Sequence, residues 1–203
     1  MIDPAIWMPL EQELGRWERH GKRAVFWLRD DDTVQPTGPL DHLLDLAQRH
    51  AIALTLAVIP KETGRALARR LDRSALVSVA VHGWSHENHA PAGEKKQELG
   101  GHRAIDIVLD ELRSGAVHLS NLHGDRFVSI LVPPWNRIDA PLLPYLPKIG
   151  YTGMSVFGPE KPSPIRSVNT HVDLIDWKST RGGARSGSAC PGDRHTAGAQ
   201  FRH

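Results

Sequence analysis

Short apolar runs alternate with helix-period segments along the first 175 residues, and this alternation restricts the possible folds more than any other feature. The expected strands are rich in β-branched residues, and the expected helices carry apolar residues three or four positions apart. We expect strands over residues 24–28, 52–59, 76–81, 127–132, 151–157 and 168–175, and helices around residues 40–47, 67–71 and 105–112. Strands that alternate with helices predict an α/β fold with a parallel sheet.

Polar clusters come directly after three of the expected strands. They are Asp30–Asp32, His82–His89 and Pro133–Arg137. In a (β/α) barrel the functional side chains converge at the carboxyl ends of several strands, whereas a doubly wound sheet gathers them at one crevice. The positions of the clusters therefore favour a barrel over a doubly wound sheet.

The composition changes abruptly after residue 178. Residues 179–203 are dominated by Gly, Ser, Ala and Arg, and Phe201 is their one large apolar residue. Such a segment buries too little apolar surface to offset the entropy lost on ordering it. We therefore predict one domain over residues 1–178 and a disordered tail over residues 179–203, whose composition is typical of a frameshift or a premature end.

Composition and charge argue against several classes of protein. The 25 basic and 23 acidic residues give a net charge of +2, and no basic block is present, so we expect no nucleic-acid partner. Cys190 is the single cysteine, which excludes an intramolecular disulfide. The N-terminus has no signal-peptide pattern, and the longest apolar run, residues 51–60, is too short to span a bilayer. We expect a cytoplasmic protein without a membrane partner.

Histidines and aspartates at the predicted strand ends indicate a metal site. His82 and His86 are four residues apart, and imidazole is a ligand suited to zinc and its neighbours in the transition series. The triplet Asp30–Asp32 places like charges side by side, which is costly unless a cation or an arginine lies among them. We therefore expect a divalent metal, zinc in the first place, with cobalt, nickel or iron as alternatives. The segment His86–His89 is not a zinc-protease motif, because its histidines are three residues apart rather than four.

Four segments, in this order, resemble the motifs of the polysaccharide deacetylases of carbohydrate esterase family 4. They are Arg29-Asp30-Asp31-Asp32, His82-Gly83-Trp84-Ser85-His86, Val132-Pro133-Pro134-Trp135-Asn136 and Asp173-Leu174-Ile175-Asp176-Trp177. The resemblance extends from about Ala24 to Trp177. It implies an α/β fold of the distorted, incomplete (β/α) barrel type, with the last strand or strands missing. It also implies a hydrolase that removes an acetyl or related acyl group from an amino sugar or other amide.

The same resemblance implies roles for individual residues. The metal ligands would be Asp32, His82 and His86, and the catalytic residues would be Asp31, Trp135 and Asp173. Asp31 would act as the general base on the attacking water, and the backbone N–H of Trp135 would help to hold the oxyanion. Asp173 would help to orient the base. The substrate would contact Trp84, His89, Pro134, Asn136, Arg137 and Trp177.

The three consecutive aspartates leave the register of the first motif open. Thr33 follows them where the family usually has Gly, so Asp30-Asp31 is an alternative to Asp31-Asp32 as the functional pair. We prefer Asp31-Asp32, because related members carry an arginine two residues before the pair, as Arg29 is here.

Other departures affect the expected activity. The third motif usually begins with an arginine that pairs with the fourth-motif aspartate; this chain has Val132, and either Arg137 or Arg29 is a candidate replacement. Gly83 stands where the second motif usually has Ser or Thr. The fifth motif, a strand with Leu-x-His that supplies the general acid, is absent, so we expect impaired activity.

Three functional hypotheses follow. The first is the metal-dependent deacetylase, with a small-molecule or oligosaccharide substrate whose identity the sequence leaves open. The alternative is a non-catalytic metal- and carbohydrate-binding protein on the same scaffold. The third is an iron oxygenase, since two histidines and a carboxylate also form that facial triad. The third is weak, because those sites usually occur in β-rich folds.

Overall fold

The computed structural model describes residue 5 and residues 7–175 of the chain and divides it into two compact units. Residues 26–170 form the larger unit, and residues 1–25 and 171–203 are assigned to the smaller one. In chain order, the larger unit contains β1 Leu28–Thr33, α2 Gly38–Arg49, β2 Leu54–Val58, α3 Arg65–Leu71, β3 Val77–His82, α4 Ile105–His123, β4 Phe127–Val132, β5 Gly153–Met154 and β6 Arg166–Ser167. Short 3₁₀ helices η2 Gly124–Arg126, η3 Pro134–Asn136, η4 Ala140–Tyr145 and η5 Pro147–Ile149 lie in the connections.

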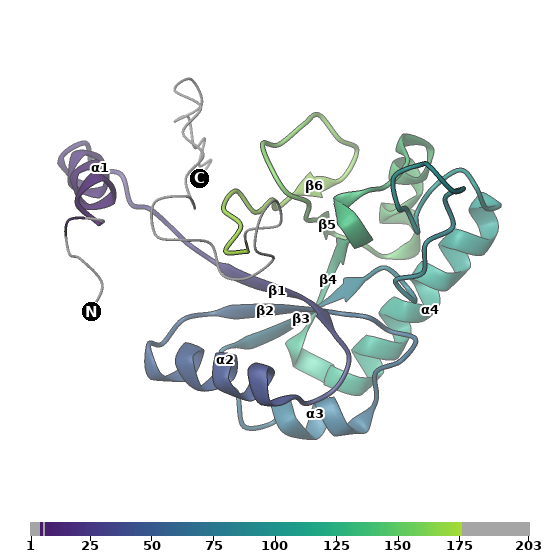
Figure 1. Cartoon of the computed structure of the whole chain (residues 1–203), viewed down its shortest axis with the longest axis horizontal. Coiled ribbons are helices and arrows are strands. Elements are labelled where there is room, and N and C mark those ends of the chain that lie inside the picture. The colour runs from purple at the N-terminus through teal and green to yellow at the C-terminus, as the bar shows by residue number, and fades with distance from the viewer. Residues whose placement is uncertain (1–4, 6, 176–203) are drawn as a thin grey trace. The chain divides into compact units, whose positions relative to one another are not determined.

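The six strands form one parallel sheet in which spatial order follows chain order, from β1 to β6 (Figure 1). A doubly wound sheet would reverse its strand order at a switch point, and this sheet does not. Among the strands of the described region β1 and β6 each have one neighbour, so the sheet is not closed. The predicted incomplete (β/α) barrel is therefore confirmed.

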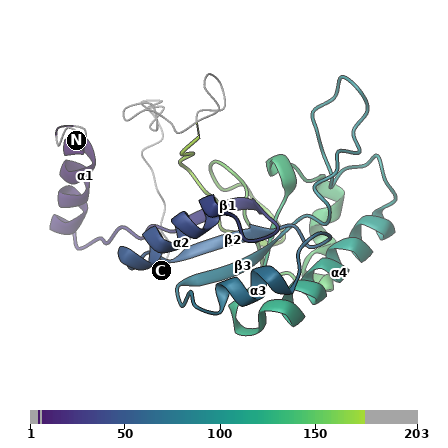
Figure 2. The ribbon, with the colours of Figure 1, turned by 60° about the horizontal axis from the view of Figure 1, so that its bottom comes forward.

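Helices α2, α3 and α4 pack against the same face of the sheet, which becomes the outer face of the incomplete barrel (Figure 2). Alternate residues of β2 and β3, from Leu54 to Val58 and from Val77 to Val81, are fully buried against these helices. The opposite, inner face carries smaller side chains, with Ala57, Ala80 and Val132 in a separate cluster. The large apolar side chains of the strands thus lie on the outer face of the sheet. The inner face carries small side chains and, at the strand ends, polar groups.

The first strand differs from the prediction. Residues 24–28 were expected to form it, yet β1 begins at Leu28 and includes the charged residues that were expected to follow it. Val25 and Phe26 are 65% and 72% exposed, and β1 begins where Leu28 pairs with Leu54 of β2. Most of the apolar run therefore lies before the strand. Strand β2 begins only at Leu54, so residues before Leu28 have no partner in the sheet.

The last two strands are also shorter than predicted. Residues 151–157 and 168–175 were expected to be strands, but β5 and β6 have two residues each, and β6 ends before the expected range begins. Beyond β5 the N–H of Val156 donates to the side chain of Asn169 at 3.1 Å. A single parallel bridge then joins Phe157 to Thr170. The hydrogen bond from Val156 to the Asn169 side chain therefore interrupts the backbone ladder that would continue β5 and β6.

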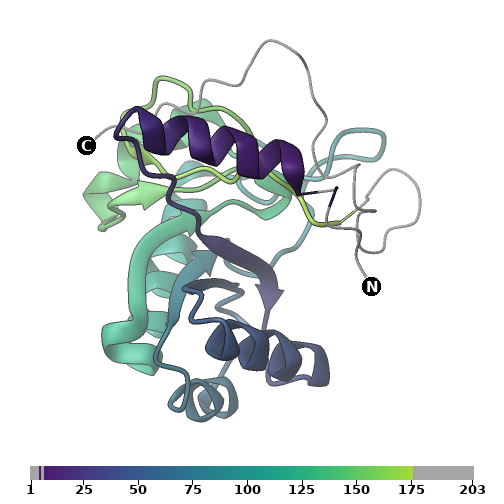
Figure 3. The ribbon, with the colours of Figure 1, turned by 90° about the vertical axis from the view of Figure 1, so that its left-hand side faces the viewer.

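In the smaller unit, helix α1 Met8–Arg19 was not predicted (Figure 3). Within it, the Trp17 indole N–H donates to Glu13 at 2.8 Å. The predicted tail, residues 179–203, lies outside the described residues, and both it and the domain boundary at residue 178 stay predictions. In the part of the chain that the structure describes, no helix is long and apolar enough to cross a membrane.

Candidate metal centre

His82 is the last residue of β3 and continues the inner face of the strand after Ala80. Its side chain is buried, with the residue 2% exposed, and its Nδ1 lies 2.9 Å from the carbonyl oxygen of Val132 on β4. A carbonyl only accepts hydrogen bonds, so Nδ1 carries the hydrogen and Nε2 of the neutral ring presents its lone pair. This hydrogen bond fixes both the tautomer and the ring orientation that metal binding requires.

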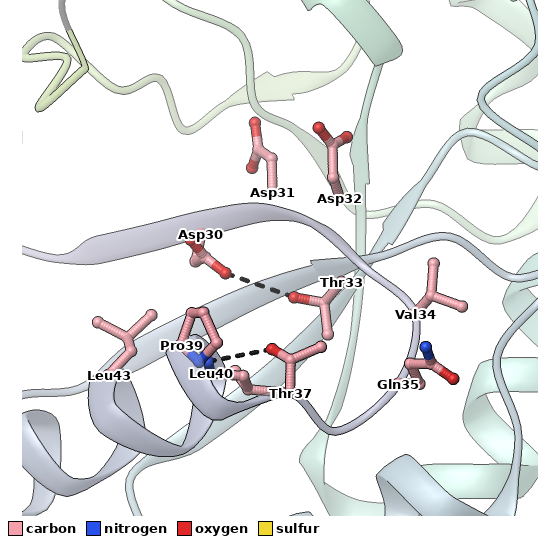
Figure 4. Close-up of a pocket in the computed structure, with 10 residues that line it drawn as sticks. All are labelled: Asp30, Asp31, Asp32, Thr33, Val34, Gln35, Thr37, Pro39, Leu40 and Leu43. Carbon is pink, nitrogen blue, oxygen red and sulfur yellow. Dashed lines mark hydrogen bonds between the residues drawn. The ribbon is translucent and has the colours of Figure 1, made fainter. Parts of the chain in front are cut away.

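The three aspartates do not all face the same side of β1. Asp30 pairs with Leu56 in the sheet, and the register then shifts before Thr33, where Asp32 adopts a left-handed conformation with φ +65°. This irregularity places Asp31 and Asp32 together on one side of the strand, while Asp30 points the other way, towards Thr33 and the start of α2 (Figure 4). Aspartate tolerates a left-handed backbone better than most residues.

Asp30 lines a hollow between β1 and the first turns of α2 (Figure 4). Its carboxylate accepts a hydrogen bond from the Thr33 hydroxyl at 3.4 Å. Burial, and next the negative charge of Asp31, raise the pKa of Asp30. The Asp30 side chain thus points away from those of Asp31 and Asp32.

Asp32, His82 and His86 bring one ligand atom each to a common point, with all three atoms within 4.8 Å of one another. Asp32 Oδ1 lies 2.9 Å from His82 Nε2 and 3.2 Å from His86 Nε2. Because His82 Nε2 presents a lone pair, two acceptors face each other at 2.9 Å, an arrangement that needs a proton or a cation between them. The donor set and its geometry fit a divalent metal.

The protonation states also suit a cation. With a proton between His82 and Asp32, their hydrogen bond is the largest cause that lowers the pKa of Asp32, so its carboxylate favours the ionised form. Burial lowers the pKa of His86, which favours the neutral imidazole. A neutral imidazole and an ionised carboxylate are the forms that bind metals.

Arg29 holds Asp31 beside this cluster. Its side chain is 6% exposed, and its Nη2 donates to Asp31 Oδ2 at 2.9 Å. A second, less well aligned contact joins Nε to Oδ1 at 2.8 Å, and Nη1 donates to the Ser155 hydroxyl at 2.7 Å. Of the two candidate arginines, Arg29 therefore contacts the predicted base, while Arg137 donates to the backbone oxygen of Lys96 at 2.7 Å.

The third motif forms a strained turn next to His86. Trp135 and Asn136 both have left-handed backbones, with φ +54° and +57°. The Trp135 and His86 rings lie with their centroids 4.3 Å apart, and Lys96 Nζ lies 5.9 Å from the centre of the Trp135 ring. The turn thus brings the Trp135 ring to the edge of the Asp–His–His cluster, and Lys96, from the connection between β3 and α4, lies over that ring.

The remaining predicted residues are more dispersed. The Trp84 ring packs against α4 at Gly115, and His89 lies outside the cluster of candidate ligands. Asp173 belongs to the smaller unit, where it accepts the Ile175 N–H at 2.9 Å, and Trp177 lies outside the described residues. The substrate and orienting roles assigned to these four residues stay predictions.

Sequence reasoning missed two residues of the site, Ser155 and Glu98. Ser155 is fully buried and anchors Arg29, and Glu98 is fully buried beside the loop that carries His86. A lone serine after a short strand gives no signal, and Glu98 lies in a charged stretch that is typical of a solvated loop.

Known proteins match this chain by structure rather than by sequence. No family model matches the sequence, and no curated protein does. A family 4 carbohydrate esterase from Streptomyces lividans, solved with acetate, aligns with a TM-score of 0.52 at 17% identity over 67% of this chain and 64% of its own. A de-N-acetylase from Aggregatibacter actinomycetemcomitans aligns at 0.55 and 14% identity, over 78% and 74%. The Streptococcus pyogenes deacetylase PplD, also solved with acetate, aligns at 0.55 and 14%, over 83% and 71%.

The chain has the polysaccharide deacetylase fold. The part that aligns spans less than two thirds of the Streptomyces esterase. In barrel-type folds the functional groups lie at the carboxyl ends of the strands. In this example of the polysaccharide deacetylase fold, Asp31 and Asp32 near the end of β1, His82 at the end of β3 and the turn after β4 occupy such positions.

Proposed function

We propose that this protein is a metal-dependent hydrolase that removes an acetyl or related acyl group from an amino sugar or other amide. One observation carries the proposal: the cluster of Asp32, His82 and His86 lies beside an aspartate that a buried arginine holds in place. A metal-binding protein without turnover needs the cluster but not the held carboxylate. The fold supports a carbohydrate derivative as the substrate class.

Asp32, His82 and His86 would hold the metal and leave further coordination positions open. When bound, a divalent cation supplies a water molecule of lowered pKa and a Lewis acid for the acyl carbonyl. Zinc suits two imidazoles and one carboxylate best among the common metals.

Asp31 would be the general base. It lies on the same side of β1 as Asp32, and its contacts with Arg29 involve both carboxylate oxygens and fix its direction. A carboxylate held within reach of the attacking water can take the proton as the bond to the acyl carbon forms. Loss of orientation would cost rate, because proton transfer depends on distance.

The turn after β4 would hold the oxyanion. The N–H groups of Asn136 and Arg137 are taken by the carbonyls of Pro133 and Pro134, and the two prolines have no N–H. We therefore assign the oxyanion contact to the backbone N–H of Trp135. One such donor is worth about 2.7–4 kcal/mol in comparable sites.

The test has two measurements. The first is metal content after dialysis, for the wild type and for the double variant His82→Ala/His86→Ala, with His42→Ala/His50→Ala as the control because these two histidines are exposed. We expect stoichiometric metal in the wild type and the control, and none in the site variant. Metal that remains in the site variant would place the centre elsewhere, with His89 the next ligand to test.

The second measurement is acetate release from an acetylated chitooligosaccharide. We expect release by the metal-loaded protein and none by the His82→Ala/His86→Ala variant. A protein that keeps its metal and binds the oligosaccharide, yet releases no acetate, would contradict the hydrolase proposal. That result would favour the non-catalytic binding protein instead.

A further inference from the structure

Glu98 is a completely buried carboxylate that the chemistry above does not use. It lies in the long connection between β3 and α4 and is 0% exposed. Burying an ionisable carboxylate is expensive unless hydrogen bonds or charges compensate for the lost hydration. The contacts of Glu98 therefore indicate why the fold keeps it.

One oxygen of Glu98 accepts three hydrogen bonds from two consecutive residues, Trp84 and Ser85. Oε1 accepts the N–H of Trp84 at 3.2 Å, the N–H of Ser85 at 2.7 Å and the Ser85 hydroxyl at 3.1 Å. Successive backbone N–H groups that converge in this way form an anion-binding nest. Here the anion in the nest is the protein's own side chain.

The nest lies between two of the candidate metal ligands. Trp84 and Ser85 are the residues between Gly83 and His86, and both Gly83 and His86 have left-handed backbones, with φ +59° and +57°. A left-handed histidine is held in an uncommon conformation, which persists only where the surroundings impose it. The hydrogen bonds to Glu98 fix the backbone one and two residues before His86.

Gly83 is the residue that makes room for this carboxylate. A Cβ at position 83 would lie 2.0 Å from Glu98 Oε2 and 2.6 Å from Cγ of Pro134. No side chain fits there while Glu98 occupies its place. The glycine at this position and the buried glutamate therefore form one arrangement.

We propose that Glu98 is a positioning residue for the metal centre: it clamps the turn of residues 83–86 and thereby directs His86 Nε2 towards Asp32 and His82. The consequence for metal affinity rests on the proposed function, whereas the clamp itself does not. Partners of this kind, which orient a ligand without touching the metal, typically change metal affinity by about 10–100-fold.

The experiment compares Glu98→Ala and Glu98→Gln in the full chain. Glu98→Gln keeps an acceptor oxygen of the same shape, so it should retain most of the clamp even if Glu98→Ala folds poorly. The controls are Glu94→Ala and Glu94→Gln, because Glu94 is an exposed carboxylate of the same connection. Amide hydrogen exchange of Trp84 and Ser85 is measured in the metal-free protein, and Co²⁺ affinity and the visible Co²⁺ spectrum are measured after loading.

We expect Glu98→Ala to speed exchange at Trp84 and Ser85 on the order of tenfold or more, as the loss of charge-assisted hydrogen bonds implies. It should weaken Co²⁺ binding by about 10–100-fold and alter the visible spectrum. Glu98→Gln should restore a large part of both properties, and the Glu94 variants should match the wild type. Exchange and Co²⁺ affinity that stay at wild-type values in both Glu98 variants would overturn the proposal. A wild type that binds no Co²⁺ would overturn the proposed function, while the exchange comparison still decides whether Glu98 clamps the turn.

Discussion

Acidification should destabilise this protein through His123, and the size of the effect follows from the site. His123 ends helix α4, is 8% exposed, and neither ring nitrogen has a hydrogen-bond partner within the described residues. Burial lowers the pKa of His123 to about 4, His118 and Arg126 add to this with positive charge, and Asp72 opposes it. The folded protein therefore resists protonation of a ring that the unfolded chain protonates at an ordinary pKa of 6.5.

The sign and the pH window follow from these two pKa values. Between pH 6.5 and about 4 the unfolded chain binds more protons than the folded one, so the free energy of unfolding falls as the pH falls. Above pH 6.5 the neutral His123 makes its full contribution to the free energy of unfolding. Below about pH 4 the ring is protonated in both states, and the free energy of unfolding falls no further through His123. At about 1.4 kcal/mol per pKa unit, the loss approaches roughly 3 kcal/mol, and about 2.5 kcal/mol of it is reached by pH 4.5. This loss is a large part of the free energy of unfolding of a typical protein, which is about 5–15 kcal/mol.

The assay is urea unfolding between pH 7.5 and 4.5, with a chelator present, for the wild type, His123→Leu and His42→Leu. Carboxylates also titrate in this range, so the difference between variants isolates His123. Leucine removes no hydrogen bond that the described structure contains, and we expect His123→Leu to lie within about 1 kcal/mol of the wild type at pH 7.5. At pH 4.5 it should be more stable by about 2.5 kcal/mol. His42→Leu, at an exposed histidine of α2 that does not contribute to the His123 pKa, should follow the wild type. Parallel pH profiles for the wild type and His123→Leu would refute the reasoning.

Three further predictions concern the site and its scaffold. Asp31→Asn should keep the metal and lower the rate of acetate release by about 10²–10⁴, and loss of the metal in this variant would mean that Asp31 is itself a ligand. Gly83→Ala should cost about 2–4 kcal/mol in urea unfolding, because its Cβ would overlap Glu98 and its φ is +59°; wild-type stability would show that the turn adapts. Thr37→Ala should cost about 1 kcal/mol by the same assay, because the Thr37 hydroxyl caps α2 by accepting the N–H of Leu40 at 3.2 Å, and an unchanged midpoint would mean that water replaces the cap.

The sequence predicts strands β2, β3 and β4 of the sheet correctly, but it misplaces strand β1. Strands β2, β3 and β4 coincide with apolar runs that Thr55, Ser78 and Ser129 alone interrupt, because their positions are buried or half-buried on both faces. In β1 the inner face carries charge instead. Arg29 and Asp31 point to the same side and neutralise each other within the strand, so hydropathy alone places the strand too early.

The candidate ligands were predictable as residue types, whereas their convergence was not. Histidines four apart and a run of aspartates indicate metal chemistry from spacing alone. The selection of Asp32 depends on a left-handed backbone at an irregular point of β1, and the direction of His86 depends on another left-handed residue after β3. Backbone conformations of this kind follow from tertiary contacts, and local sequence does not encode them strongly.

Two departures from the family pattern, at Val132 and Gly83, can be compared with the contacts that the structure shows near them. Val132 stands where the family usually has an arginine, and it packs with Ala57 and Ala80 on the inner face. The guanidinium that reaches Asp31 comes from Arg29, two residues earlier on the same strand, where related members also carry an arginine. At position 83 a glycine leaves room for the Glu98 carboxylate, which accepts hydrogen bonds from Trp84 and Ser85. A comparison of motifs one position at a time does not show either contact, the Arg29–Asp31 pair or the fit of Glu98 against Gly83.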